Sequence, residues 1–102
     1  MEITVSGKHL DITDAIREYA IEKVSKLEKY FDQILNVEVV ADKGHSEFEI
    51  EIIVHVGHHE PFIATTQGED LYATIDQARE KLERQLSDHK QKVKNHKHNP
   101  TR

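Results

Sequence analysis

Apolar residues recur at helical spacing along the last third of the chain. Between Asp70 and Lys97 the stripe consists of Leu71, Ile75, Ala78, Leu82, Leu86 and Val93. His89 fills the one gap in this stripe, and the pattern predicts a single long amphipathic helix with Leu82 buried in its contact face. Acidic residues precede the stripe and lysines follow it, which suits the two ends of a helix dipole.

A shorter stripe of the same kind lies nearer the N-terminus. Thr13 is the expected N-cap, because a threonine hydroxyl can accept a hydrogen bond from the first turn of a helix. The stripe then continues to about residue 31 through Ile16, Ala20, Val24, Leu27 and Phe31. This pattern predicts one helix between Thr13 and the region of residue 31.

Four segments have the alternation typical of strands: residues 2–8, 36–42, 46–56 and 62–67. In residues 46–56 isoleucine, valine and phenylalanine mostly alternate with glutamate and histidine, so one sheet face should lie in water. Both helices should therefore cover the other face. The order predicts an α+β fold, β-α-β-β-β-α, with a four-stranded mixed sheet whose first two strands are parallel. We expect one domain over residues 1–95 and a flexible tail over residues 96–102.

Composition excludes several classes of protein. The chain has no cysteine, no run of about 18 apolar residues and no signal-peptide pattern, which favours a cytoplasmic location and no membrane contact. No glycine-rich phosphate loop and no paired nucleophile and base can be found. We therefore expect no enzyme activity, no cofactor and no small-molecule substrate.

Basic residues are concentrated in the C-terminal quarter of an acidic chain. Residues 79–102 carry eight lysines and arginines against three acidic residues, whereas the remainder carries six against sixteen. On a helical wheel Lys81, Arg84 and Lys92 form one flank of the apolar stripe, and Arg79, Lys90, Lys94 and Lys97 form the other. A solvated helix is the ordinary explanation for such charges, but their concentration favours binding of a polyanion.

The eight histidines raise the question of a metal site. His58 and His59 are adjacent in an expected turn, and His96 and His98 lie near the C-terminus. Neither pair is accompanied by a cysteine, an HExxH motif or an ordered third ligand. We expect no functional metal site.

Two segments, Ile12 to Phe31 and Glu69 to Lys92, carry a resemblance to a known family. The second contains, at matching spacing, Asp70, Tyr72, Ile75, Asp76, Lys81, Leu82, Arg84, Gln85 and Leu86. Together the two segments resemble the short ribosome hibernation promoting factors, which include ribosome-associated inhibitor A and are also called the sigma-54 modulation protein family. The resemblance covers nearly the whole chain, and the family has the β-α-β-β-β-α fold.

The resemblance implies a non-catalytic protein that binds ribosomal RNA of the small ribosomal subunit, in the channel for messenger and transfer RNA. It would thereby block translation in resting or stationary-phase cells. Without the extra C-terminal domain of long members, any role in ribosome dimerisation is expected to need a separate factor. By matching position, the implied RNA contacts are Arg17, Lys23, Lys26, Lys81, Arg84, Lys90, Lys92 and Lys94.

Three positions qualify this interpretation. Asp88 is acidic where a polar or basic residue is expected, whereas Leu71 replaces a methionine at little cost. Tyr72 is expected to be structural rather than a stacking contact for RNA.

The alternative function is a protein-binding regulator, such as a transcription-factor modulator, that presents an acidic sheet face with Glu47, Glu49 and Glu51.

Overall fold

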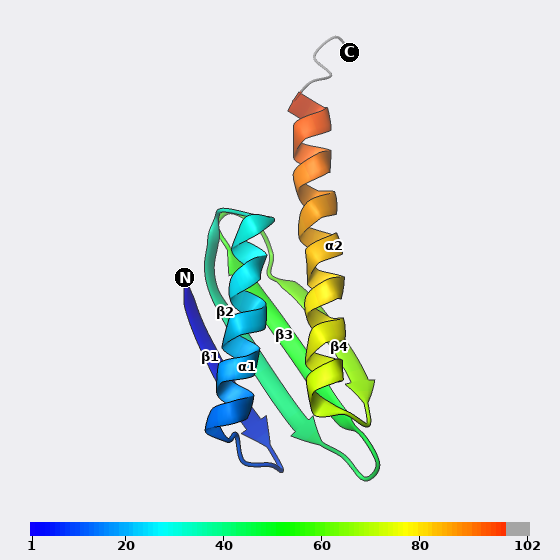
Figure 1. The fold of residues 1–102 in the computed structure, drawn as a ribbon. Coiled ribbons are helices and arrows are strands. Elements are labelled where there is room, and N and C mark those ends of the chain that lie inside the picture. The colour runs from blue at the N-terminus through cyan, green and yellow to red at the C-terminus, as the bar shows by residue number, and fades with distance from the viewer. Residues whose placement is uncertain (98–102) are drawn as a thin grey trace.

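The computed structural model describes residues 1–97 and, in the last helix, side chains as far as Gln91. Its elements are β1 (Glu2–Lys8), α1 (Asp14–Ser25), a short 3₁₀ helix η1 (Lys26–Lys29), β2 (Ile34–Lys43), β3 (Phe48–Val56), β4 (Phe62–Gly68) and α2 (Leu71–Lys97) (Figure 1). The predicted order β-α-β-β-β-α is confirmed. No helix among the described residues is long and apolar enough to cross a membrane.

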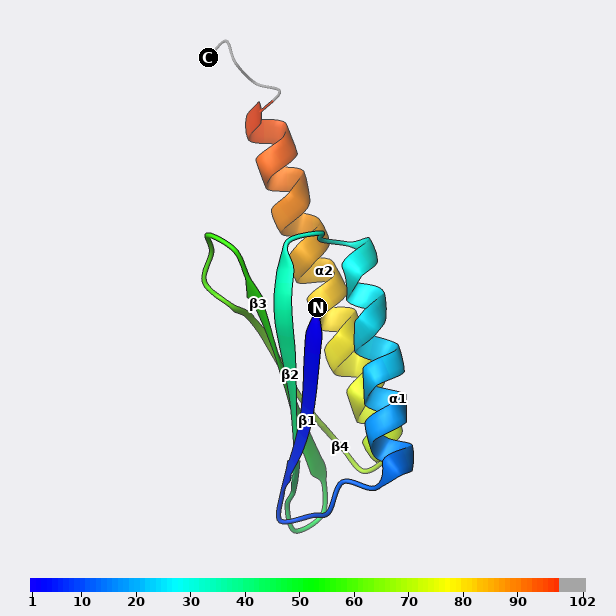
Figure 2. The ribbon, with the colours of Figure 1, turned by 90° about the vertical axis from the view of Figure 1, so that its left-hand side faces the viewer.

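The four strands form one mixed sheet in the order β1-β2-β3-β4. β1 pairs with β2 in parallel, with Val5 opposite Val39, because α1 carries the chain back to the starting end of the sheet. β2, β3 and β4 then pair as antiparallel neighbours. Seen along the sheet edge, both helices lie on the same face (Figure 2), so the predicted arrangement of the helices is confirmed.

The core lies between this face and the two helices. Alternate residues of the strands point into it, as do the apolar stripes of both helices, and Leu82 is fully buried as predicted. The members contributed by the strands are Val5, Val37, Val39, Ala41, Ile50, Ile52, Val54, Val56 and Ala64. The helical side contributes Ile16, Ala20, Val24, Leu27, Leu71, Ile75, Ala78, Leu82 and Leu86.

Several strand boundaries differ from the expectation, by one or two residues each. β3 begins at Phe48 rather than at residue 46, because the N–H of Gly44 donates to the carbonyl of Glu47 at 2.8 Å and closes a turn there. β2 is longer than expected at both ends. An irregularity between Ile34 and Asn36 lets Ile34 pair with Val56, so the strand starts two residues earlier than the alternation indicated.

The first helix is shorter than its apolar stripe indicated. It begins as predicted, with the Thr13 hydroxyl accepting from the N–H of Ile16 at 3.1 Å. It ends at Ser25, where the N–H of Lys26 donates to two carbonyls and the chain tightens into η1. Leu27 stays buried in η1, whereas Phe31 lies beyond both helical segments. A tighter turn keeps the apolar contact that the spacing requires while it ends the α-helix.

The start of α2 is held on the end of β4. The Asp70 carboxylate accepts from the N–H groups of Tyr72 at 2.9 Å and Ala73 at 3.3 Å, which caps the helix. A Cβ on Gly68 would lie 2.6 Å from the Thr74 hydroxyl, so this approach requires glycine. α2 continues through residues 96 and 97, which were expected to belong to the tail, and residues 98–102 lie outside the described part.

Candidate nucleic-acid interface

The three cations expected to bind RNA from the first helical region lie on different sides of it. Arg17 extends toward the sheet edge, where its guanidinium donates to the carbonyl of Val5 in β1 at 3.4 Å. Lys23 faces α2 instead, and only 24% of its side chain is exposed. Lys26 is exposed at the first position of η1. These three cations are thus spread across the helix rather than gathered at one point.

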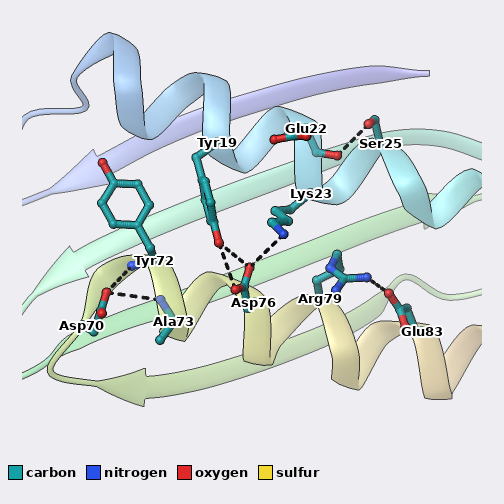
Figure 3. Close-up of polar contacts among 10 residues, drawn as sticks. All are labelled: Tyr19, Glu22, Lys23, Ser25, Asp70, Tyr72, Ala73, Asp76, Arg79 and Glu83. Atoms are coloured by element: carbon teal, nitrogen blue, oxygen red, sulfur yellow. Dashed lines mark hydrogen bonds and ion pairs between the residues drawn. The ribbon is translucent and has the colours of Figure 1, made fainter.

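Between the helices, Asp76 of α2 is the centre of a polar cluster (Figure 3). The Tyr19 hydroxyl of α1 lies 2.8 and 2.9 Å from its two carboxylate oxygens, and Lys23 Nζ lies 3.8 Å from one of them. Lys23 Nζ also lies 5.3 Å from the centre of the Tyr19 ring. Lys23 is therefore partly neutralised within the protein, and its contact with RNA stays a prediction.

Tyr19 has an unusual protonation equilibrium in this cluster. Burial, together with the hydrogen bond to the Asp76 carboxylate, raises the pKa of Tyr19 from 10.0 to about 12. The ring of Tyr72 packs edge-on against Tyr19, with ring centres 4.8 Å apart. The contact supports the structural role expected for Tyr72, although 39% of this residue is exposed.

Sequence reasoning placed Asp76 in the family pattern but assigned it no contact. The helical wheel puts Asp76 on the same flank as Arg79. This shared flank was the one sign in the sequence that Asp76 could meet basic side chains. In the structure Arg79 forms an ion pair with Glu83, one turn further along α2 (Figure 3). The two side chains are only 18% and 20% exposed. Where this flank faces α1, Arg79 and the neighbouring Lys23 of α1 thus meet carboxylates of the protein itself.

The opposite flank of α2 lies over the free edge of β4. Lys81 Nζ donates to the carbonyl of Thr65 at 3.2 Å, and Arg84 lies one turn further along the helix. Both side chains line a groove of about 520 Å³ between β4 and α2, together with Thr65, Thr66, Gln67, Gln77 and Glu80. Lys81 and Arg84 are thus brought to one groove, as their shared flank predicted.

The remaining predicted contacts lie near the C-terminal end of α2. Figures 1 and 2 both show this part of the helix extending beyond the sheet and α1. Lys90 is exposed there. Lys92 and Lys94 belong to the helix, but their side chains lie outside the described part of the chain. A helix that extends from the body can reach a partner that the sheet does not touch.

Aromatic rings gather where α2 leaves the body. His59 stacks on Phe62 with ring centres 4.7 Å apart, and His89 lies 4.5 Å from His59 and 5.5 Å from Phe31. The gap in the apolar stripe at His89 is therefore part of a ring cluster. Among the described residues no group of three or more His, Asp or Glu side chains is placed to hold a metal ion. The histidines at positions 96 and 98 fall outside the described side chains.

The outer face of the sheet is acidic, but its carboxylates are partly engaged. The imidazole of His55 lies 2.6 Å from the Glu38 carboxylate, and that of His9 lies 2.9 Å from Asp42. Of the three glutamates expected in a row, Glu49 and Glu51 lie on β3, whereas Glu47 is in the preceding turn. The sheet face and the helical layer thus differ in charge.

The sequence matches a known protein family over most of its length. The profile of the family described as "Sigma 54 modulation protein / S30EA ribosomal protein" matches residues 3–94. A ribosome hibernation promoting factor of Azotobacter vinelandii is 44% identical over 90% of this chain and 85% of its own length. One from Escherichia coli K12 is 40% identical over 94% of this chain and its own full length.

Solved structures show the same fold. The N-terminal domain of Protein Y from Thermus thermophilus superposes with a TM-score of 0.80 and 34% identity, covering 87% of this chain and 99% of its own. A ribosomal subunit interface protein from Coxiella burnetii superposes with a TM-score of 0.82 and 28% identity, covering 88% of this chain and 98% of its own. These similarities extend over both helices and the sheet.

Proposed function

Because the chain belongs to the Sigma 54 modulation protein / S30EA ribosomal protein family, we propose that it binds the small ribosomal subunit at the channel for messenger and transfer RNA. It is a ribosome hibernation factor, as its relatives are named, and not an enzyme. Binding there would block translation in resting cells. Because ribosomes work in the cytoplasm, the proposal also assigns the protein to that compartment.

The observation that carries the proposal is the two-helix layer on one face of the sheet (Figure 2). Cations outside ion pairs lie at the borders of this layer. Lys81 and Lys26 are exposed, as is Arg84, and no carboxylate of the described residues forms an ion pair with them. Folded RNA is recognised mainly through its phosphates and its shape. A rigid basic surface meets that requirement without a stacking platform for bases.

A competition experiment tests the site. Small subunits programmed with messenger RNA and carrying labelled transfer RNA are mixed with increasing amounts of the protein, and bound label is measured after sedimentation. We expect the protein to displace the transfer RNA, and less so at higher salt, because phosphate contacts release counterions. If protein and transfer RNA remain bound together with no loss of either, the decoding channel is not the site.

The acidic sheet face gives the matched control. A variant with Glu47, Glu49 and Glu51 changed to glutamine should bind the small subunit at least as well as the wild type, because it removes only negative charge from the far side of the sheet. If this variant alone loses binding, the sheet face is the contact surface and the function is that of a protein-binding regulator.

A further inference from the structure

Two hydrogen-bond acceptors on the free edge of β4 are already occupied. β4 is the last strand of the sheet, so one side of it has no neighbouring strand among the described residues. On that side the carbonyl of Ile63 accepts from the Gln85 amide at 3.0 Å, and the carbonyl of Thr65 accepts from Lys81 Nζ at 3.2 Å. Side chains of α2 therefore hold two carbonyls that an added strand would need.

The backbone donors of the same edge face away from β3, and one of them belongs to Thr65, which lines the groove. In an antiparallel ladder the N–H and C=O of one residue point to the same side, so the N–H groups of Ile63 and Thr65 also face outward. A strand from another protein needs donors and acceptors in alternation, and this edge offers mainly donors. A ligand with acceptors only, such as a phosphate group, fits better.

The charge of the groove also favours a phosphate ligand. Lys81 directs one of its donors to a neutral carbonyl, so its positive charge is not compensated there. Arg84 adds a guanidinium with several donors, whereas Glu80 is the one acidic residue among those that line the groove. Ion pairs within the described residues do not involve Lys81 or Arg84.

We propose that the groove between β4 and α2 binds a phosphate of an RNA backbone, held by the Thr65 N–H and the Lys81 and Arg84 side chains. This inference rests on the proposed function, since it takes the RNA of the ribosome as the source of the phosphate. It moves part of the contact from the outer surface of the helices to the side of the molecule. RNA bound there would pass along the β4 edge rather than only across the helices.

Substitutions that add or remove a glutamate in the groove test it through the affinity for the small subunit. Gln77 lines the groove and is exposed, so Gln77→Glu adds a negative charge beside the phosphate without removing a cation. We expect about tenfold weaker binding to the small subunit, and a few-fold stronger binding for Glu80→Gln. The matched control is Gln33→Glu, an exposed position before β2, which should bind like the wild type. If the wild type itself does not bind, the proposed function fails; if it binds and Gln77→Glu binds equally well, only the groove is wrong.

NMR of the backbone amides tests directly whether the Thr65 N–H binds the phosphate. In the full chain labelled with ¹⁵N, addition of a short unstructured RNA should shift the Thr65 amide proton. That of Ala64, which points toward β3, should stay in place. An equal shift with inorganic phosphate alone, at the same phosphate concentration, would overturn RNA as the preferred ligand. No shift of Thr65 with either ligand would overturn the groove as a phosphate site.

Discussion

The two flanks of α2 both carry cations but have different surroundings. The α1-facing flank carries Asp76, Arg79 and Glu83, and there the charges meet opposite charges or the Tyr19 hydroxyl (Figure 3). The β4-facing flank carries Lys81 and Arg84, and there Lys81 meets a neutral carbonyl. Both flanks border the same apolar stripe, yet where α2 packs on the body of the fold only the second keeps cations outside ion pairs; on the first flank an exposed cation, Lys90, comes only further along the helix.

This difference shows that the number of cations on a helix does not measure its capacity to bind a polyanion. A cation that is paired and half-buried must break its pair before it can neutralise a phosphate, which weakens the net attraction. A cation bonded to a carbonyl keeps its charge and is held in a defined position. The contrast between the α1-facing and the β4-facing flank can be tested through the stability, the ribosome binding and the pH dependence of single and combined variants.

The largest effect should come from the stripe that both flanks share. Leu82 is fully buried between α2 and the sheet, so Leu82→Ala leaves a cavity and should lower the free energy of unfolding by roughly 2–5 kcal/mol. Urea denaturation followed by circular dichroism measures this change. A decrease well under about 1 kcal/mol would mean that the contact face of the helix has been assigned wrongly.

The next effect should separate the flanks by stability. Asp76→Ala removes the acceptor of the Tyr19 hydroxyl and the partner of Lys23, and should lower the free energy of unfolding by about 1–3 kcal/mol. Arg84→Ala, on the exposed flank, should change stability by no more than about 0.5 kcal/mol. The same denaturation experiment compares them, with Asp76→Asn as the variant that keeps an acceptor. Equal decreases for the two alanine variants would contradict the contrast.

Binding to the small subunit should separate the flanks in the opposite sense. Lys81, Arg84 and Lys92 changed together to alanine should flatten the dependence of affinity on salt by roughly one unit for each phosphate that is no longer neutralised. Changing Lys23 and Arg79 to alanine should flatten it less, because carboxylates of the protein neutralise both. Sedimentation with purified small subunits in a salt series gives both slopes. A greater flattening for the second variant would reverse the assignment.

The smallest effect concerns protonation on the α1-facing flank. The pKa of Tyr19 is raised to about 12 in the fold, so the unfolded chain, with an ordinary value of 10.0, releases this proton first. The contribution of Tyr19 to stability is therefore complete below pH 10.0 and is lost as the pH rises toward about 12. Unfolding measured across this range should show a steeper decline for the wild type than for Tyr19→Phe. Identical declines would mean that burial and the Asp76 carboxylate do not raise the pKa of Tyr19 in the fold.

Several features followed from the sequence alone because they depend on local spacing. The order of the elements, the buried stripe of α2 and the Thr13 cap all follow from the period at which apolar or capping residues recur. The division of the cations into two flanks follows from the same geometry, and the structure agrees with it at Arg79 and Lys81. Where the spacing misled, at the end of the first helix, a 3₁₀ turn kept Leu27 buried with a different backbone and left Phe31 outside both helices.

Only the tertiary structure decided which charges remain available. Tyr19 and Asp76 are 57 residues apart, and no pattern within either helix indicates that they meet. The same holds for Lys81 and Thr65, which belong to different elements and form a contact only because α2 packs over the edge of β4. Periodicity determines whether a side chain is buried, because burial depends on the element's own repeat. The partner of a polar side chain depends on which other element the fold brings beside it.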